Sequence, residues 1–228
     1  MNTKMRKVKF WGKNSLQCIA MAAGAALAVY LINGVGSSEY SGDTEAVFME
    51  LMALYPYYLL VVGAGLTMII CFSYFQTYFS ILVSMNATRK SVVGEILASI
   101  AVMGIILLLI SALIWKMTPG ETAQLGWKLL PLFTGLFFGM TAYFIIFNVV
   151  LSKWRRRGVM LMLLATIVIA VIIGFGAAAN GSIVEMQFLS LSGVAGRNFQ
   201  PVMILGIVLY LIAGFFAAAA MRKLEVRM

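Results

Sequence analysis

The chain contains no histidine, and none of its long apolar runs carries a charged residue in its middle. The charged residue nearest to such a position is Glu95, about one turn inside the start of the third run. Ionisable side chains at mid-membrane are costly, and they usually mark proton relays, ion sites or voltage sensors. Their absence argues against transport powered by an ion gradient, so another protein would have to supply the energy.

The residue sets of a self-contained enzyme are also missing. No GxxxxGK[ST] phosphate-binding loop occurs. The two cysteines, Cys18 and Cys71, lie inside apolar runs, where free thiols usually pack as small hydrophobic side chains. Serines such as Ser84 have no base to activate them, and no paired carboxylates occur within the runs. We therefore expect no catalytic residue, no metal and no cofactor bound by this chain.

Apolar residues are abundant instead: they make up 62% of the 228 residues, and only 11% are charged. Soluble domains are about one quarter charged, and a membrane-spanning helix needs roughly 20 mainly apolar residues. The sequence therefore predicts an all-α polytopic membrane protein, with one transmembrane domain over residues 1–228 and six transmembrane helices. The predicted spans are approximately 16–32, 51–85, 91–115, 127–150, 159–178 and 201–220. Cleavage of the first run as a signal peptide is a minor alternative.

The basic residues are unevenly distributed between the predicted loops. Counted on alternate sides of six spans, 14 of the 17 lysines and arginines fall on the side of both termini. The positive-inside rule then places both termini in the cytoplasm, so the net charge of +9 does not indicate nucleic-acid binding. In residues 1–15, bases alternate with apolar side chains. That segment is expected to be either a basic interfacial segment on the membrane surface or a disordered tail.

Two regions do not fit simple membrane crossings. Residues 51–85 would form about 52 Å of helix against roughly 30 Å of hydrocarbon, so part of this run is expected to project. Its polar residues Gln76, Thr77 and Ser80 either line a surface between helices or stand in the interfacial zone. Residues 180–200 are too apolar for a solvated loop, and they predict a short helix that dips back at the outer face.

Small residues recur at every fourth position in several runs, a spacing that lets helix backbones approach closely. The repeats are Ala20-Gly24-Ala28, Gly135-Gly139, Gly174-Ala178 and Gly214-Ala218. Each face packs either against another helix of the same chain or against a second copy of the protein, and the sequence leaves both alternatives open.

The most specific segment joins the second and third runs and reads Ser84-Met-Asn-Ala-Thr-Arg-Lys90. Its adjacent cations, Arg89 and Lys90, are either a lever that a cytoplasmic partner can push or ordinary positive-inside markers. The segment resembles the "S-x-G-x-T-R-K" stretch between the second and third spans of membrane subunits of ABC-type exporters of the second class. These include bacterial drug, lantibiotic-immunity and peptide exporters. The six-span layout and the basic amino-terminal segment are also similar, whereas Asn86 stands where that family commonly has glycine.

The resemblance implies a function, partners and a location. Permeases of this kind export hydrophobic or amphipathic substrates, such as drugs and antimicrobial peptides, across the bacterial cytoplasmic membrane. Exporters of peptide toxins of the phenol-soluble-modulin type are the most similar group. ATP and Mg²⁺ would be bound by a separate ATP-binding subunit, and two permease copies would pair, as a homodimer. The residues expected to couple this chain to the ATPase are Asn86, Thr88, Arg89, Lys90 and Glu95.

A path for the substrate is expected along two stripes of side chains at helical spacing. They are Phe75, Tyr78 and Phe79 in the second run, and Met140, Phe144 and Asn148 in the fourth. Ordinary core or lipid-facing packing would produce the same pattern. The favoured function is therefore an exporter permease, and the alternative is an accessory or immunity scaffold without its own transport path. A channel or gradient-driven carrier is disfavoured by the missing charges.

Overall fold

The computed structural model describes residues 3–36, 44–79, 89–179 and 198–221, and within these ranges the chain forms helices and no strands. The predicted all-α class is thus confirmed. Five helices of the described residues are long and apolar enough to cross a membrane: Trp11–Ile32, Met52–Tyr78, Ser91–Met117, Glu121–Lys153 and Gln200–Met221. The chain is a multi-pass membrane protein, whereas the count of six crossings and the cytoplasmic placement of the termini stay predictions.

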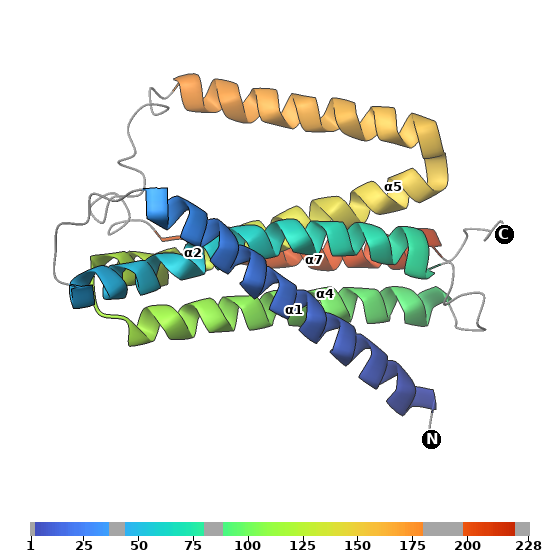
Figure 1. Ribbon diagram of the computed structural model, residues 1–228. Helices are drawn as coiled ribbons and strands as arrows, with labels where there is room; N and C mark the ends of the chain where they lie inside the picture. The colour runs from blue at the N-terminus through green and yellow to red at the C-terminus, as the bar shows by residue number, and fades with distance from the viewer. Residues whose placement is uncertain (1–2, 37–43, 80–88, 180–197, 222–228) are drawn as a thin grey trace.

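Helix α1 (Thr3–Gly36) is continuous through the basic segment and the first apolar run, and it crosses the other helices obliquely (Figure 1). It packs against α2 (Thr44–Ser73) and α4 (Arg89–Met117). Its buried face consists of residues three or four positions apart, which fall on one side of a helix: Ser15, Cys18, Ala22 and Ala26.

Helix α2 continues without a break into a π-helix, η1 (Tyr74–Tyr78). Single π-helical turns are rare and frequently occur at functional sites. In η1 the rings of Tyr74 and Tyr78 pack edge to face, with their centroids 5.6 Å apart. Of the predicted long run 51–85, the part up to Phe79 is therefore helical, and residues 80–88 lie outside the described ranges.

Helix α4 packs against α1, α2, α5 and α7. Its buried side chains recur every three or four residues and are almost fully enclosed by these neighbours: Val92, Ile96, Ile100, Met103 and Leu107. The chain then turns into α5 (Glu121–Ala179) at Gly120. The φ angle of Gly120 is +125°, in the left-handed region that glycine adopts without steric cost.

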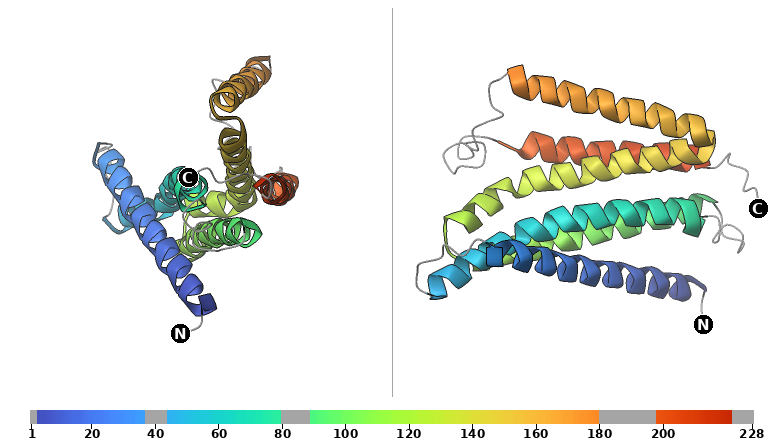
Figure 2. Two further views of the ribbon diagram at one scale, coloured as in Figure 1. Left: turned by 90° about the vertical axis from the view of Figure 1, so that its right-hand side faces the viewer. Right: turned by 45° about the horizontal axis from the view of Figure 1, so that its top comes forward.

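Helix α5 bends sharply at one end of the bundle, and its second arm runs back in the opposite direction and diverges from the first (Figure 1 and Figure 2). The predicted run 159–178 forms this second arm. A hydrogen bond between the hydroxyl groups of Tyr143 and Thr166 joins the two arms. Helix α5 makes the most extensive helix contact of the described chain, with α7 (Gln200–Met221).

At this α5–α7 contact, Gly135 and Gly206 meet backbone to backbone. A Cβ atom added at Gly206 would lie 2.7 Å from the Cα atom of Gly135. Of the two alternatives for the Gly135-Gly139 repeat, Gly135 packs within the chain, whereas the space beside Gly139 is open. Gly214 also packs within the chain, since an added Cβ would meet the side chain of Leu97 at 3.0 Å.

The other small-residue repeats have different outcomes. Ala20, Gly24 and Ala28 lie on the exposed side of α1, and no atom lies within 4 Å of a Cβ added at Gly24. Of the two alternatives for this repeat, packing within the chain does not occur among the described residues, because α1 turns the Cys18–Ala22–Ala26 face inward. The side chains of Gly174-Ala178 and the predicted outer helix within 180–197 lie outside the described residues.

One end of the bundle brings together the segments that the sequence predicts to be basic. The start of α1, the end of η1, the start of α4, the bend of α5 and the end of α7 all lie at this end (Figure 1). The turn between α4 and α5 lies at the opposite end. We call these the basic end and the turn end.

Candidate functional site

The structure describes three of the five predicted ATPase-coupling residues. Asn86 and Thr88 lie outside the described residues, and Arg89 and Lys90 form the first two positions of α4. Glu95 lies about one and a half turns further along the same helix. The start of α4 and the end of η1 lie at the basic end of the bundle (Figure 1).

The carboxylate of Glu95 is held by hydrogen bonds within the chain. Its Oε2 atom accepts a bond of 3.0 Å from the indole Nε1 of Trp11, on the neighbouring helix α1. Its Oε1 atom accepts a bond of 2.7 Å from the hydroxyl of Ser91, one turn earlier on α4. A hydrogen bond to a charged group contributes about 1.5–3 kcal/mol, so Glu95 ties α1 to α4 beside the predicted coupling segment.

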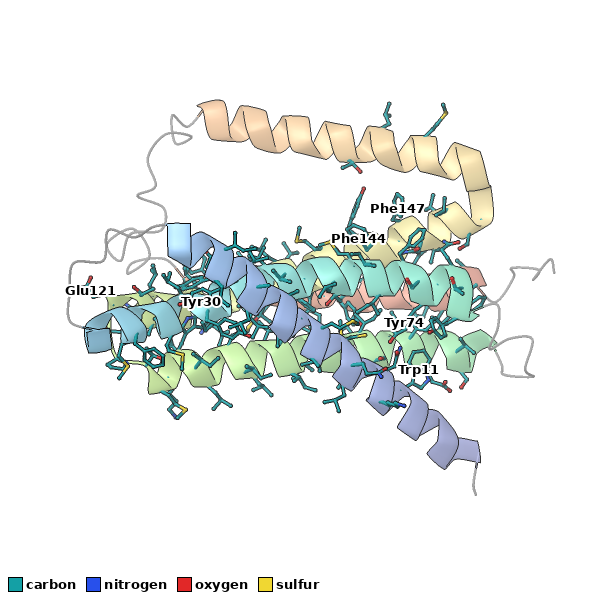
Figure 3. All side chains as sticks on the ribbon, viewed as in Figure 1. Trp11, Tyr30, Tyr74, Glu121, Phe144 and Phe147 are labelled. Carbon is teal, nitrogen blue, oxygen red and sulfur yellow. The ribbon has the colours of Figure 1, made fainter. Side chains whose placement is uncertain are left out.

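Trp11 also contacts η1, so that three elements meet at one point. Its ring packs edge to face on Tyr74, with centroids 5.1 Å apart. One turn further along α1, the amide of Asn14 donates a bond of 2.6 Å to the hydroxyl of Tyr74. Figure 3 shows Trp11 and Tyr74 close together at the basic end. We call Trp11, Asn14, Tyr74 and Glu95 the three-helix junction.

A groove opens beside this junction, between α1 and α4. It encloses about 680 Å³, and its walls are mainly apolar side chains such as Leu16, Ile19 and Val102. Its polar part comprises Trp11, Ser15, Glu95 and Ser99. The hydroxyls of Ser15 and Ser99 are buried and form a mutual hydrogen bond of 2.8 Å. The groove therefore offers hydrogen-bonding groups at the level of Glu95 and an apolar surface beyond them.

A second polar contact joins η1 to α5. The side-chain amide of Gln76 donates to the Oδ1 atom of Asn148 at 3.4 Å and to the hydroxyl of Ser152 at 3.5 Å. Asn148 is fully buried, and its own amide donates to the Phe144 carbonyl at 2.8 Å. Of the two alternatives for Gln76, the contact between helices is thus confirmed. Both bonds from Gln76 are long, which makes this a weak link between the helices.

The predicted substrate-path residues are brought together in two groups. Phe75 and Phe79 are buried in the core, and Tyr78 is half-buried against Tyr74. Phe144 is half-buried near the bend of α5, where its ring packs against Phe147 with centroids 6.3 Å apart (Figure 3). Met140 is exposed on the same helix. Because Phe75, Phe79 and Asn148 are covered by the chain's own helices, a path along them requires the α2–α5 contact to open.

Sequence reasoning missed the three-helix junction and the groove. Their residues lie one turn apart on both helices: Trp11 and Ser15 on α1, and Glu95 and Ser99 on α4. When two helices lie side by side, two polar residues one turn apart on one helix can each contact a polar residue of a pair with the same spacing on the other helix. This matched spacing is the signal that the sequence contained. Within the described ranges, no three side chains of the types that bind metal ions come together.

The chain was compared with family models, with curated proteins and with solved structures. No family model, curated protein or solved structure matches it.

Proposed function

We propose that the chain is the permease subunit of an ATP-driven exporter of hydrophobic or amphipathic substrates, such as peptides or drugs. A separate ATP-binding subunit supplies the energy, and two permease copies pair as a homodimer in the bacterial cytoplasmic membrane. In this proposal the basic end of the bundle faces the cytoplasm, where the segment Ser84–Lys90 contacts the ATPase.

The observation that carries this proposal is the three-helix junction beside Arg89 and Lys90. A force applied to the start of α4 reaches α1 through the bond between Glu95 and Trp11. It reaches η1 through the contacts of Trp11 and Asn14 with Tyr74. A partner that moves the loop before α4 would therefore move three helices together. Coupling of this kind needs discrete contacts between rigid elements, which the junction provides.

The groove between α1 and α4 supports the substrate class. An amphipathic molecule has an apolar part and a hydrogen-bonding part, and the groove offers Leu16, Ile19 and Val102 to the first and Ser15, Ser99 and Glu95 to the second. Predominantly apolar sites with a few polar groups are typical of small-molecule binding.

The alternative is an accessory or immunity scaffold without a transport path. One observation favours it: Phe75, Phe79 and Asn148 are buried, so the predicted path is closed in this arrangement. The two functions differ in their effect on an ATPase. A scaffold leaves ATP hydrolysis indifferent to amphipathic peptides, whereas an exporter responds to them.

The decisive experiment is co-purification of the chain with the ATP-binding subunit encoded beside it, followed by an ATPase assay in lipid. We expect a stable complex whose hydrolysis rate responds to amphipathic peptides. The double variant Arg89→Glu/Lys90→Glu should fold normally, as judged by circular dichroism, but lose the response to peptides.

A matched control is the double variant Lys13→Glu/Lys153→Glu, which changes the net charge equally with exposed lysines at the same end but outside the coupling segment. It should keep the response. A complex that is indifferent to every peptide tested would refute the exporter function. Equal effects of the two double variants would refute the coupling role of Arg89 and Lys90.

A further inference from the structure

A cavity at the turn end of the bundle is lined by two lysines from different helices. It encloses about 530 Å³ between the last turn of α4 and the first two turns of α5. Lys116 of α4 and Lys128 of α5 both line the cavity. Gln124, which stands between them in the sequence, lines it as well. Both lysines are exposed. This turn-end cavity is far from the three-helix junction, as the positions of Glu121 and Trp11 in Figure 3 show.

The wall of the turn-end cavity is held in place by Trp115. Its indole Nε1 donates a bond of 3.0 Å to the carbonyl of Ala53, and its ring packs on Tyr57 with centroids 4.9 Å apart. On the other side the ring lies against Gly126, where an added Cβ would approach the Nε1 atom to 2.6 Å. The cavity is therefore formed by ordered packing of α2, α4 and α5 and not by a loose loop.

Within the described ranges, the two lysines that line the turn-end cavity have no acidic partner. Among the residues that the structure describes, neither Lys116 nor Lys128 has an ion-pair or hydrogen-bond partner. Glu121, the acid nearest in the chain, does not line the cavity and makes no ion pair with a described residue. Two ammonium groups that face one cavity repel each other, and an anion bound between them would remove this repulsion.

Two features beside the turn-end cavity bear on which kind of anion would fit it. Trp127, which is 50% exposed, stands at its rim, and tryptophan prefers the zone between lipid headgroups and hydrocarbon. On α4, the exposed apolar side chains Leu109, Leu113 and Met117 lie four residues apart, and Leu109 and Leu113 precede Lys116 by about two turns and one turn of the helix. A paired cationic site above an apolar stripe matches the shape of a phospholipid, whose charged phosphate stands above its acyl chains.

We propose that the turn-end cavity binds a phospholipid with a net negative headgroup through its phosphodiester. The phosphate lies between the Lys116 and Lys128 ammonium groups, the amide of Gln124 donates a further hydrogen bond, and an acyl chain follows the Leu109–Met117 stripe. A zwitterionic lipid fits less well, because its own cation competes with the lysines for the phosphate. The site does not depend on the transport function proposed above.

The test is a lipid titration of the purified chain in detergent, followed by native mass spectrometry. The probes are phosphatidylglycerol, which is anionic, and phosphatidylcholine, which has the same phosphodiester but no net charge. Each lysine near a membrane surface contributes roughly a fivefold preference for anionic lipid, so Lys116→Gln/Lys128→Gln should weaken phosphatidylglycerol binding about thirtyfold. Binding of phosphatidylcholine should change little.

The double variant Lys13→Gln/Lys153→Gln removes two exposed lysines at the other end and should keep the tight phosphatidylglycerol site. Circular dichroism and a thermal melt check that both variants fold. Equal binding of the two lipids by the unmodified chain, or equal losses in the two double variants, would overturn the proposal. Displacement of phosphatidylglycerol by millimolar inorganic phosphate alone would also overturn it, because the site would then take the free anion and not the lipid.

Discussion

The contact between Gly135 of α5 and Gly206 of α7 allows a quantitative test of the fold. We predict that Gly206→Ala destabilises the protein by about 1–3 kcal/mol, as overpacking of a close contact typically does. The new methyl carbon would lie 2.7 Å from the Cα and carbonyl carbon of Gly135. Carbon atoms pack best at about 3.5–4.0 Å, so the two helices would have to separate by about 1 Å.

The cost arises because the obstacle is backbone and not a flexible side chain. A side chain could rotate away, but the backbone of Gly135 can move only with the whole of α5. A radial gap of 0.5–1 Å already loses a quarter to a half of the dispersion energy at each affected contact. Because lipid supplies no hydrophobic drive that would hold membrane helices together, this loss is not compensated.

The assay is unfolding in mixed micelles of rising SDS content, followed by circular dichroism. Gly139→Ala is the matched control, because Gly139 lies one turn from Gly135 on the same helix and has open space beside it. It should leave the protein as stable or stabilise it by up to about 1 kcal/mol, because alanine is the better helix former and meets no neighbouring atom there. The double variant Gly135→Ala/Gly206→Ala should cost less than the sum of its parts, because both methyl groups separate the same two helices. Equal midpoints for Gly206→Ala and Gly139→Ala would show that the helices do not approach closely here.

Three further predictions concern hydrogen bonds. Trp11→Phe keeps the ring contact with Tyr74 but loses the indole bond to the α4 carboxylate, so the free energy of unfolding should fall by about 1.5–3 kcal/mol. In the same SDS titration, Trp127→Phe should have little effect, and equal losses would contradict the role of that bond. Ser99→Ala leaves a buried hydroxyl of Ser15 without its partner and should cost about 1–3 kcal/mol, whereas the Ser15→Ala/Ser99→Ala pair should cost less than this single change. The buried hydroxyl of Ser111 has no partner among the described residues, so Ser111→Ala should leave the protein as stable or slightly more stable, and a clear loss in a thermal melt would refute this.

The helices could be predicted well from the sequence because apolar length alone decides whether a segment can cross a bilayer. The predicted spans 16–32, 91–115 and 201–220 each lie inside one helix of the structure. The helix ends were predicted less well. Helix α1 extends through the basic residues that precede its apolar run, because helix formation continues wherever no residue breaks it.

Which side of each helix faces inward could not be predicted. In α1 both Ala20-Gly24-Ala28 and Cys18-Ala22-Ala26 are stripes of small residues, and only the second is buried. In a water-soluble protein, polarity would separate the two stripes. In a membrane helix both faces are apolar, so packing against neighbours decides and the sequence of one helix carries no signal for it.

The candidate site shows the same division between local sequence and tertiary structure. The segment Ser84–Lys90 was recognised from local sequence, whereas the bond from Trp11 to Glu95 joins residues 84 positions apart. By itself, the sequence determined the helical class and the runs that are long, apolar and uncharged enough to span a membrane, because these depend on composition within about 20 consecutive residues. Only the tertiary structure decided that Trp11, Tyr74 and Glu95 meet at one end and that Lys116 and Lys128 share a cavity at the other. Such contacts depend on how the helices cross and turn, which local composition does not specify.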